Sequence, residues 1–136
     1  MTRYLAVDLG DRRTGLAAGD DETGLVDPLE VLEVPREKGL LEAVLRRVAE
    51  HGPDVVVIGL PYNMDGTEGP RAAISRAFGA ALAEAAGVRI EYADERLTSF
   101  AAEGRLAGRG HTRRQKKKRL DAIAAAELLR DHLGLA

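Results

Sequence analysis

Three acidic residues of this chain could together bind divalent metal ions: Asp8, Glu95 and Asp121. Asp8 closes the apolar run 4–7, Glu95 follows the strand-like segment 88–93, and Asp121 lies in the alanine-rich segment that ends the chain. Mg²⁺ and Mn²⁺ prefer oxygen ligands such as carboxylates. Two such ions, about 3.5 to 4 Å apart, can activate a water and stabilise the leaving oxygen of a phosphodiester. The pattern predicts these three acids as metal ligands and catalytic residues of a nuclease.

Just before Asp121 comes a strongly basic segment. Eight of the residues from 105 to 119 are Lys or Arg and none is acidic, although the whole chain has 20 basic against 22 acidic residues. Such a local concentration of positive charge is suited to a phosphate backbone, and the alternative interpretation is a solvated face. The side chains that we expect to contact nucleic acid here are Arg113, Arg114, Lys116, Lys117 and Lys118, and Arg96 is expected to join them.

Each acid also has an ordinary structural explanation. Asp8 could cap the turn that begins at Gly10, and Asp121 could pair with a lysine one helical turn away. Asp94 and Glu95 are adjacent and point in opposite directions if the strand continues through them. The residues alone leave open which of these two is the metal ligand.

The loop 61–69 is a second candidate for substrate contact. It follows a buried strand at the carboxyl end, where open sheets of this kind usually bind ligands, and nine residues is long for a mere connection. Asn63 and Thr67 are the expected contacts to nucleic acid, and Asp65 is a weaker candidate for the metal site. The alternative is an ordinary turn at Asp65-Gly66.

The hydrophobic pattern predicts a mixed five-stranded sheet flanked by helices, because strand-like and helix-like periodicities alternate along the chain. The first three strands form a meander whose third strand, interrupted by Pro28, belongs at an edge. The glycines of its first turn, Gly10 and Gly15, are expected to supply positive φ angles. The strands are expected at 4–9, 14–19, 26–34, 54–60 and 88–93, and the helices at 37–51, 70–86, 98–106 and from the capping box of Thr112 and Gln115 onward.

Length and composition predict one domain spanning residues 1–136. Cysteine is absent, the only serines are Ser75 and Ser99, and the three histidines lack a metal-ligand spacing, which argues against thiolate, serine-triad and zinc chemistry. Of the histidines, only His111 is a candidate for phosphate contact. We find no signal peptide and no transmembrane segment, and we expect a cytoplasmic protein.

Four segments, in order along nearly the whole chain, resemble motifs of the YqgF/RuvX family. They are residues 6–15 (AVDLGDRRTG), 59–70 (GLPYNMDGTEGP), 94–99 (DERLTS) and 120–125 (LDAIAA). The resemblance favours Glu95 over Asp94 and includes Arg13, in the first motif, among the expected nucleic-acid contacts. The last segment departs from the family pattern, since Ala122 stands where the family often has Lys.

The resemblance implies a ribonuclease H-like α/β fold, with a three-strand antiparallel meander plus two parallel strands. It also implies an Mg²⁺- or Mn²⁺-dependent nuclease, acting on the 5′ end of the small-subunit ribosomal RNA precursor, on four-way DNA junctions, or on both. A junction would suit a homodimer and an RNA end a monomer. The rivals are a nucleic-acid-binding module without catalysis and a phosphate-loop ATP-binding protein of the actin-like type, suggested by Asp8-Leu9-Gly10 with Thr14-Gly15.

Overall fold

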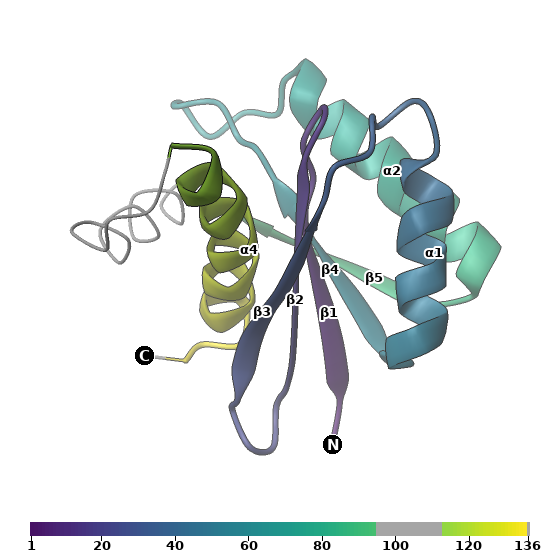
Figure 1. Ribbon diagram of the computed structural model, residues 1–136, viewed down its shortest axis with the longest axis vertical. Helices are drawn as coiled ribbons and strands as arrows, with labels where there is room; N and C mark the ends of the chain where they lie inside the picture. Colours follow the sequence, from purple (N-terminus) through teal and green to yellow (C-terminus); the bar gives the residue numbers. More distant parts are fainter. Residues whose placement is uncertain (95–112, 136) are drawn as a thin grey trace.

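The fold is a five-stranded mixed sheet with helices on both faces (Figure 1). The computed structural model describes residues 1–94 and 113–135, with side chains for 1–94 and 121–135. The strands run in the order β3-β2-β1-β4-β5, with antiparallel pairing from β1 to β3 and parallel pairing among β1, β4 and β5. The elements are β1 Arg3–Asp8, β2 Thr14–Asp20, β3 Val26–Leu32, α1 Leu40–His51, β4 Val55–Leu60, α2 Pro70–Ala86, β5 Arg89–Asp94 and α4 Arg113–His132.

This arrangement confirms the predicted meander followed by two parallel strands, including the edge position of β3. Pro28 pairs with Ala17 where the register between β2 and β3 shifts, so the missing N–H of the proline falls at an irregularity of an edge strand. The helix predicted at 37–51 begins only at Leu40. Gly39 has φ 105°, a left-handed conformation that cannot belong to the helix. The helix predicted at 98–106 and the capping residue Thr112 lie outside the described residues.

Hydrophobic cores lie on both faces of the sheet, one beneath α1 and α2 and the other beneath α4. Figure 1 shows these helices on either side of the sheet. On one face, Leu5 and Val7 of β1 pack with residues of α1 and α2 such as Val44 and Leu82. On the other, Ala6 of β1 packs with α4 through small and aliphatic residues of that helix. Successive side chains of a strand point to opposite faces, so odd positions of β1 face α1 and α2 and even positions face α4.

All the candidate site elements meet at one end of the sheet. The carboxyl ends of β1 and β4, the turn between β1 and β2, and the first turns of α1, α2 and α4 lie at the upper end in Figure 1. Open sheets with parallel central strands bind ligands at this end. Among the described residues, no helix is long and apolar enough to cross a membrane.

Candidate active site

Asp8 is the last residue of β1, the central strand, and its side chain belongs to the face that carries α4. Ala6, two residues earlier, packs against α4, and the pleat gives Asp8 the same direction. Asp8 is paired with Gly15 of the neighbouring strand β2. Because β1 is bonded on both sides, to β2 and to β4, the carboxylate of Asp8 has a rigid base.

Asp121 approaches Asp8 because α4 rests directly on Gly15. A Cβ atom on Gly15 would lie 1.9 Å from the carbonyl oxygen of Asp121 and 3.0 Å from the backbone nitrogen of Ala122. The helix can come this close only because Gly15 has no side chain and because its own contacting residues are small, with Ala125 fully buried. The backbone of Asp121 therefore packs directly on Gly15, the strand partner of Asp8.

The turn between β1 and β2 uses its glycines differently from the sequence prediction. Gly10 and Gly15 are expected to supply positive φ angles, and neither has one. That interpretation is wrong for both residues, since each glycine instead permits a close approach. A Cβ on Gly10 would lie 2.1 Å from the carbonyl oxygen of Arg13 within the turn, while the Gly10 N–H donates to the Thr14 hydroxyl at 3.3 Å.

Arg13 lies beside the candidate metal ligand Asp121. Its Nε is 3.4 Å from Oδ2 of Asp121, and both side chains are about one-third exposed. Both residues line an open cleft of about 1010 Å³ between the turn 10–13 and the connection from β3 to α1. The cleft also has Arg12 and Lys38 on its walls, together with Asp11 and Glu33. Its mixed charge and openness suit a length of polymer more than an enclosed small molecule.

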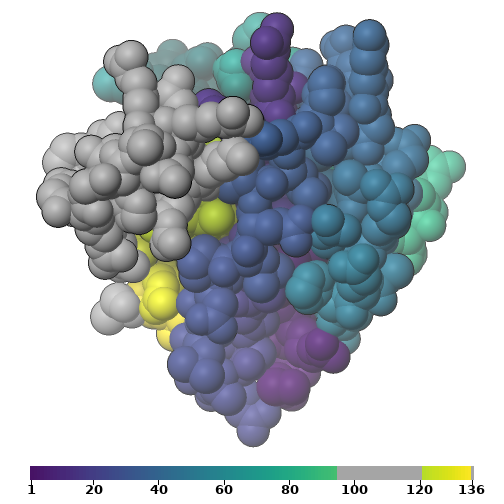
Figure 2. All heavy atoms as spheres, viewed as in Figure 1, coloured from purple at the N-terminus to yellow at the C-terminus, as the bar shows by residue number. Residues whose placement is uncertain are grey.

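The cleft opens at the end of the molecule described above. In the space-filling view, the turn after β1 and the segment that leads into α1 both project at the upper edge (Figure 2). Residues 121–132 of α4 lie beside β3 on the same side of the molecule. The cleft therefore joins three segments that are far apart in the sequence.

The pleat of β5 distinguishes between the two adjacent acids at its end. Ala93 packs in the core beneath α4, and Ile90 and Tyr92 pack in the opposite core. Asp94 has the same parity as Ile90 and Tyr92, so its side chain belongs to the face that carries α1 and α2. Asp94 is therefore on the opposite face from Asp8. Glu95 lies outside the described residues.

Two polar contacts fix the far end of α4. Nε2 of His132 is 2.7 Å from Oε1 of Glu91 in β5, and Nη2 of Arg130 donates to the carbonyl oxygen of Val26 at 3.1 Å. These contacts join the helix to both edge strands of the sheet. With Gly15 under its other end, α4 has little freedom to slide, which holds Asp121 in place.

The loop 61–69 is a structured hairpin whose polar side chains bond to one another. Asn63 donates from Nδ2 to the Thr67 hydroxyl at 3.0 Å, and that hydroxyl donates to Asp65 at 2.6 Å. The hydrogen bonds from the Thr67 hydroxyl and backbone amide lower the pKa of Asp65. Gly66 has φ 85°, as the predicted turn requires. Asn63, Asp65 and Thr67 thus shape the loop.

The base of the same loop is held by an arginine of α2. Arg76 makes two hydrogen bonds to Glu68, at 2.6 and 2.8 Å, and these bonds lower the pKa of the Glu68 carboxyl. The guanidinium of Arg76 also lies over the ring of Tyr92, 4.9 Å from its centroid. Met64, at the tip, is 99% exposed. The loop is thus held by hydrogen bonds at its base and within it, and one apolar side chain is exposed at its tip.

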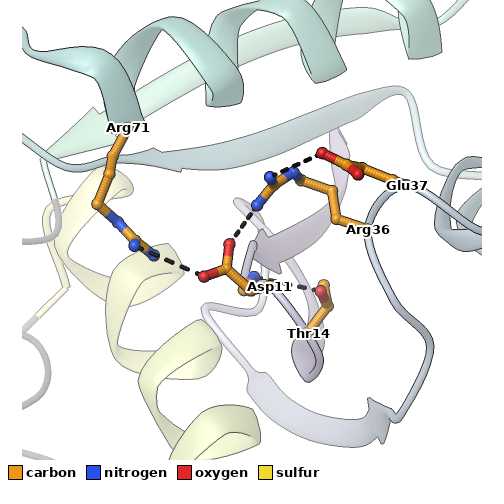
Figure 3. A network of polar contacts seen from close by, with 6 residues as sticks. Asp11, Thr14, Arg36, Glu37 and Arg71 are labelled. Carbon is orange, nitrogen blue, oxygen red and sulfur yellow. Dashed lines mark hydrogen bonds and ion pairs between the residues drawn. The ribbon is translucent and has the colours of Figure 1, made fainter.

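Asp11, in the same turn as Arg13, joins the site to α2 through a network that the sequence did not reveal (Figure 3). Its carboxylate is paired with Arg36, which precedes α1, and lies 3.8 Å from Nη1 of Arg71 in the first turn of α2. Arg36 also lies 3.7 Å from Glu37. No spacing in the sequence relates positions 11, 36 and 71, so only the fold brings them together.

The remaining predicted contacts fall on the first turns of α4 or outside the described residues. Residues 113–118 form those first turns, at the same end of the sheet as Asp8. Arg96 and His111 lie outside the described residues. Within residues 1–94 and 121–135 there is no group of three or more potential metal-ligating side chains, and one of the three predicted acids is not among them.

Comparison with known proteins identifies the family. A family model described as "RuvX: Holliday junction resolvase" matches residues 2–134. The chain belongs to this family. A protein of Anaeromyxobacter sp. (strain Fw109-5) named "Putative pre-16S rRNA nuclease" is 43% identical over 96% of both chains, and a Streptococcus sanguinis protein of the same name is 38% identical over 96% of both.

Solved structures of resolvases share the fold of this RuvX family member. RuvC of T. thermophilus in complex with a Holliday junction substrate aligns over 100% of this chain and 98% of its own, with a TM-score of 0.60 and 17% identity. The Fowlpox virus resolvase in its DNA complex aligns over 97% of both chains, with a TM-score of 0.61 and 13% identity. These likenesses confirm the predicted ribonuclease H-like fold.

Proposed function

We propose that this protein is a divalent-metal-dependent nuclease whose active site contains Asp8, Glu95 and Asp121. The observation that carries the proposal is the packing of α4 on Gly15, which brings the backbone of Asp121 next to the strand partner of Asp8. Membership of the RuvX family supports a nuclease over a non-catalytic binding module or an ATP-binding protein.

The residues fit a hard divalent cation. Asp8 and Asp121 supply carboxylate oxygens from two rigid elements on one side of the sheet, and Mg²⁺ and Mn²⁺ both prefer such ligands. Bound there, a pair of ions would supply the activated water and charge neutralisation that phosphodiester hydrolysis requires. Either ion satisfies this donor set.

Arg13 has a role that depends on the charge of Asp121. In the structure its guanidinium lies beside that carboxylate and partly offsets its charge. We propose that Arg13 turns to a substrate phosphate when a cation replaces it at Asp121. The basic side chains expected on the first turns of α4 would hold the adjoining backbone of the nucleic acid.

The proposed substrate is the precursor of small-subunit ribosomal RNA, cut near its 5′ end. The relatives named for a pre-16S rRNA nuclease are about 40% identical over 96% of the chain, whereas the solved resolvases share only the fold. Cleavage of a precursor RNA and of a four-way DNA junction by one preparation, with and without Mg²⁺ or Mn²⁺, tests this. Metal-dependent cleavage of the junction alone would reverse the assignment, and absence of cleavage with either ion would contradict the nuclease.

The direction of the Asp94 side chain leads to a paired prediction. We expect Glu95→Gln to lower cleavage more than about 100-fold, because even the loss of a residue that only orients a metal ligand costs roughly 10- to 100-fold. Asp94→Asn should retain most of the activity, because Asp94 belongs to the opposite face of β5. Single-turnover cleavage by the two variants measures this. If Asp94→Asn is inactive and Glu95→Gln is active, Asp94 and not Glu95 is the metal ligand.

Replacing Lys116, Lys117 and Lys118 together by Ala tests the basic segment. We expect weaker binding to RNA and DNA alike, with a log-log salt slope shallower by about 0.7 to 0.9 for each phosphate that is no longer neutralised. The helix itself should persist, since positive charge in its first turns opposes the macrodipole. Fluorescence anisotropy at several salt concentrations measures the slope, and an unchanged slope and affinity would identify the segment as a solvated face.

A further inference from the structure

A small polar pocket lies at the same end of the sheet as the candidate active site, between the β1 end and α2. It is lined by Leu9, Arg36, Pro61, Arg71, Ile74 and Ser75. Its volume of about 20 Å³ admits a single oxygen atom, since one water needs roughly 10 to 15 Å³. Leu9 directly follows Asp8 but packs in the core beneath α1 and α2, so the pocket lies at the same end of the sheet as the proposed metal site and on its other face.

Ser75 gives this pocket an unused hydrogen-bonding group. The residue is only 4% exposed, and among the described residues its hydroxyl has no hydrogen-bond partner. It lies four residues after Arg71, hence on the same face of α2. Because Ser75 lines the pocket, its hydroxyl is open to a hydrogen bond from that side. A ligand oxygen in the pocket would satisfy it.

The amino end of α2 also favours an anion. Gly69 precedes the helix and provides no side-chain cap, Pro70 takes the first position, and the first turn contains no acid. The free N–H groups of such a helix end carry a partial positive charge. The guanidinium of Arg71 adds a full charge at the same end.

The two arginines of the pocket already share an anion. The carboxylate of Asp11 pairs with Arg36 through one oxygen and lies 3.8 Å from Arg71 through the other, as Figure 3 shows. Glu37 is a weaker second partner of Arg36, at 3.7 Å, and its side chain is 85% exposed. Asp11 is itself 63% exposed, so an anion from solvent can compete with its carboxylate for the two arginines.

We propose that this pocket is a phosphate site for the nucleic-acid strand, in which one phosphate oxygen reaches Ser75 between Arg36 and Arg71. Asp11 is then an internal competitor that holds the two arginines until the strand arrives. The proposal rests on the proposed function, because the strand is its substrate. It adds a second anchoring point, on the α2 side of the sheet, to the basic segment of α4.

The test measures binding of RNA and DNA without divalent metal, so that no cleavage occurs. Arg71→Gln should raise the dissociation constant about 5- to 30-fold and make the salt slope shallower by about 0.7 to 0.9. Ser75→Ala should weaken binding with the slope unchanged, because it removes no charge. Asp11→Asn should strengthen binding. The matched control is Arg46→Gln, an exposed arginine of α1 that lines none of these pockets and should change nothing.

The two variants should change the affinity for nucleic acid in opposite directions: Asp11→Asn should raise it and Arg71→Gln should lower it. Unchanged affinity and slope in Arg71→Gln, or weaker binding in Asp11→Asn, would overturn the proposal while leaving a nucleic-acid-binding nuclease intact. If the wild type binds neither RNA nor DNA, the proposed function fails. Titration with inorganic phosphate then tests separately whether the pocket binds phosphate. Phosphate-dependent changes in the backbone amide chemical shifts of positions 71 and 72 that disappear in Arg71→Gln would support the phosphate site. If the wild type shows no such changes, the phosphate site is refuted.

Discussion

Asp8→Asn should lower cleavage more than about 100-fold while leaving the fold intact. The amide keeps the shape of the side chain at the end of β1 but removes the charge that a divalent ion needs. Removal of a ligand should lower the rate more than the roughly 10- to 100-fold that follows the loss of a residue hydrogen-bonded to a ligand. Single-turnover cleavage with metal-stripped and reconstituted protein gives the measurement.

A second readout separates impaired metal binding from damaged folding. Mg²⁺ at tenfold its dissociation constant should stabilise the wild type by about 1.4 kcal/mol, seen as a rise in Tm. Asp8→Asn should lack that rise. Without metal, its Tm should be close to that of the wild type, since the amide keeps the shape of the side chain. The control is Asp131→Asn, at the exposed far end of α4, which should keep both properties. Retained turnover in Asp8→Asn would contradict the metal-site proposal.

The sequence predicts the helices and strands well where the hydrophobic periodicity agrees with the residues that start or end an element. The bounds of α2 match because Pro70 suits its first position and Gly87, with φ 66°, ends it. Pro28 correctly indicates an edge strand, since a proline lacks the N–H that a central strand requires. The start of α1 is missed because the predicted helix includes residues 37–39, which precede its first apolar residue, Leu40, and the backbone is left-handed at Gly39.

The site is predicted less completely, because its contacts join distant segments. Asp8 is found from its position after an apolar run, and its face follows from the pleat once the cores are known. The network of Asp11, Arg36 and Arg71 has no local signal, since each residue alone resembles a solvated charge. Gly15 stands out in the sequence as a glycine within a motif. A glycine is expected both in a tight turn and at a close contact with a helix, so the sequence alone does not show that Gly15 contacts α4.

Gly15→Ala should disrupt both the fold and the active site. The new Cβ would lie 1.9 Å from the carbonyl oxygen of Asp121, and the obstructing atoms are backbone on both sides, which no rotamer change relieves. Overpacking typically costs about 1 to 3 kcal/mol, and we expect about 3 kcal/mol or more here. If α4 shifts to make room, Asp121 moves away from Asp8, and a displacement of about 1 Å at an active site can cost roughly 100-fold in rate.

The control variant is Gly52→Ala, at the end of α1. Gly52 has φ 58° and nothing within 4 Å of its Cβ position, so alanine there has only a conformational cost, about 1 to 2 kcal/mol. Both variants should unfold at lower urea concentrations, but only Gly15→Ala should lose cleavage under conditions where the protein remains folded. Chemical denaturation and single-turnover cleavage measure the two effects separately. Full activity in folded Gly15→Ala would show that the contact between β2 and α4 does not position Asp121 for the reaction.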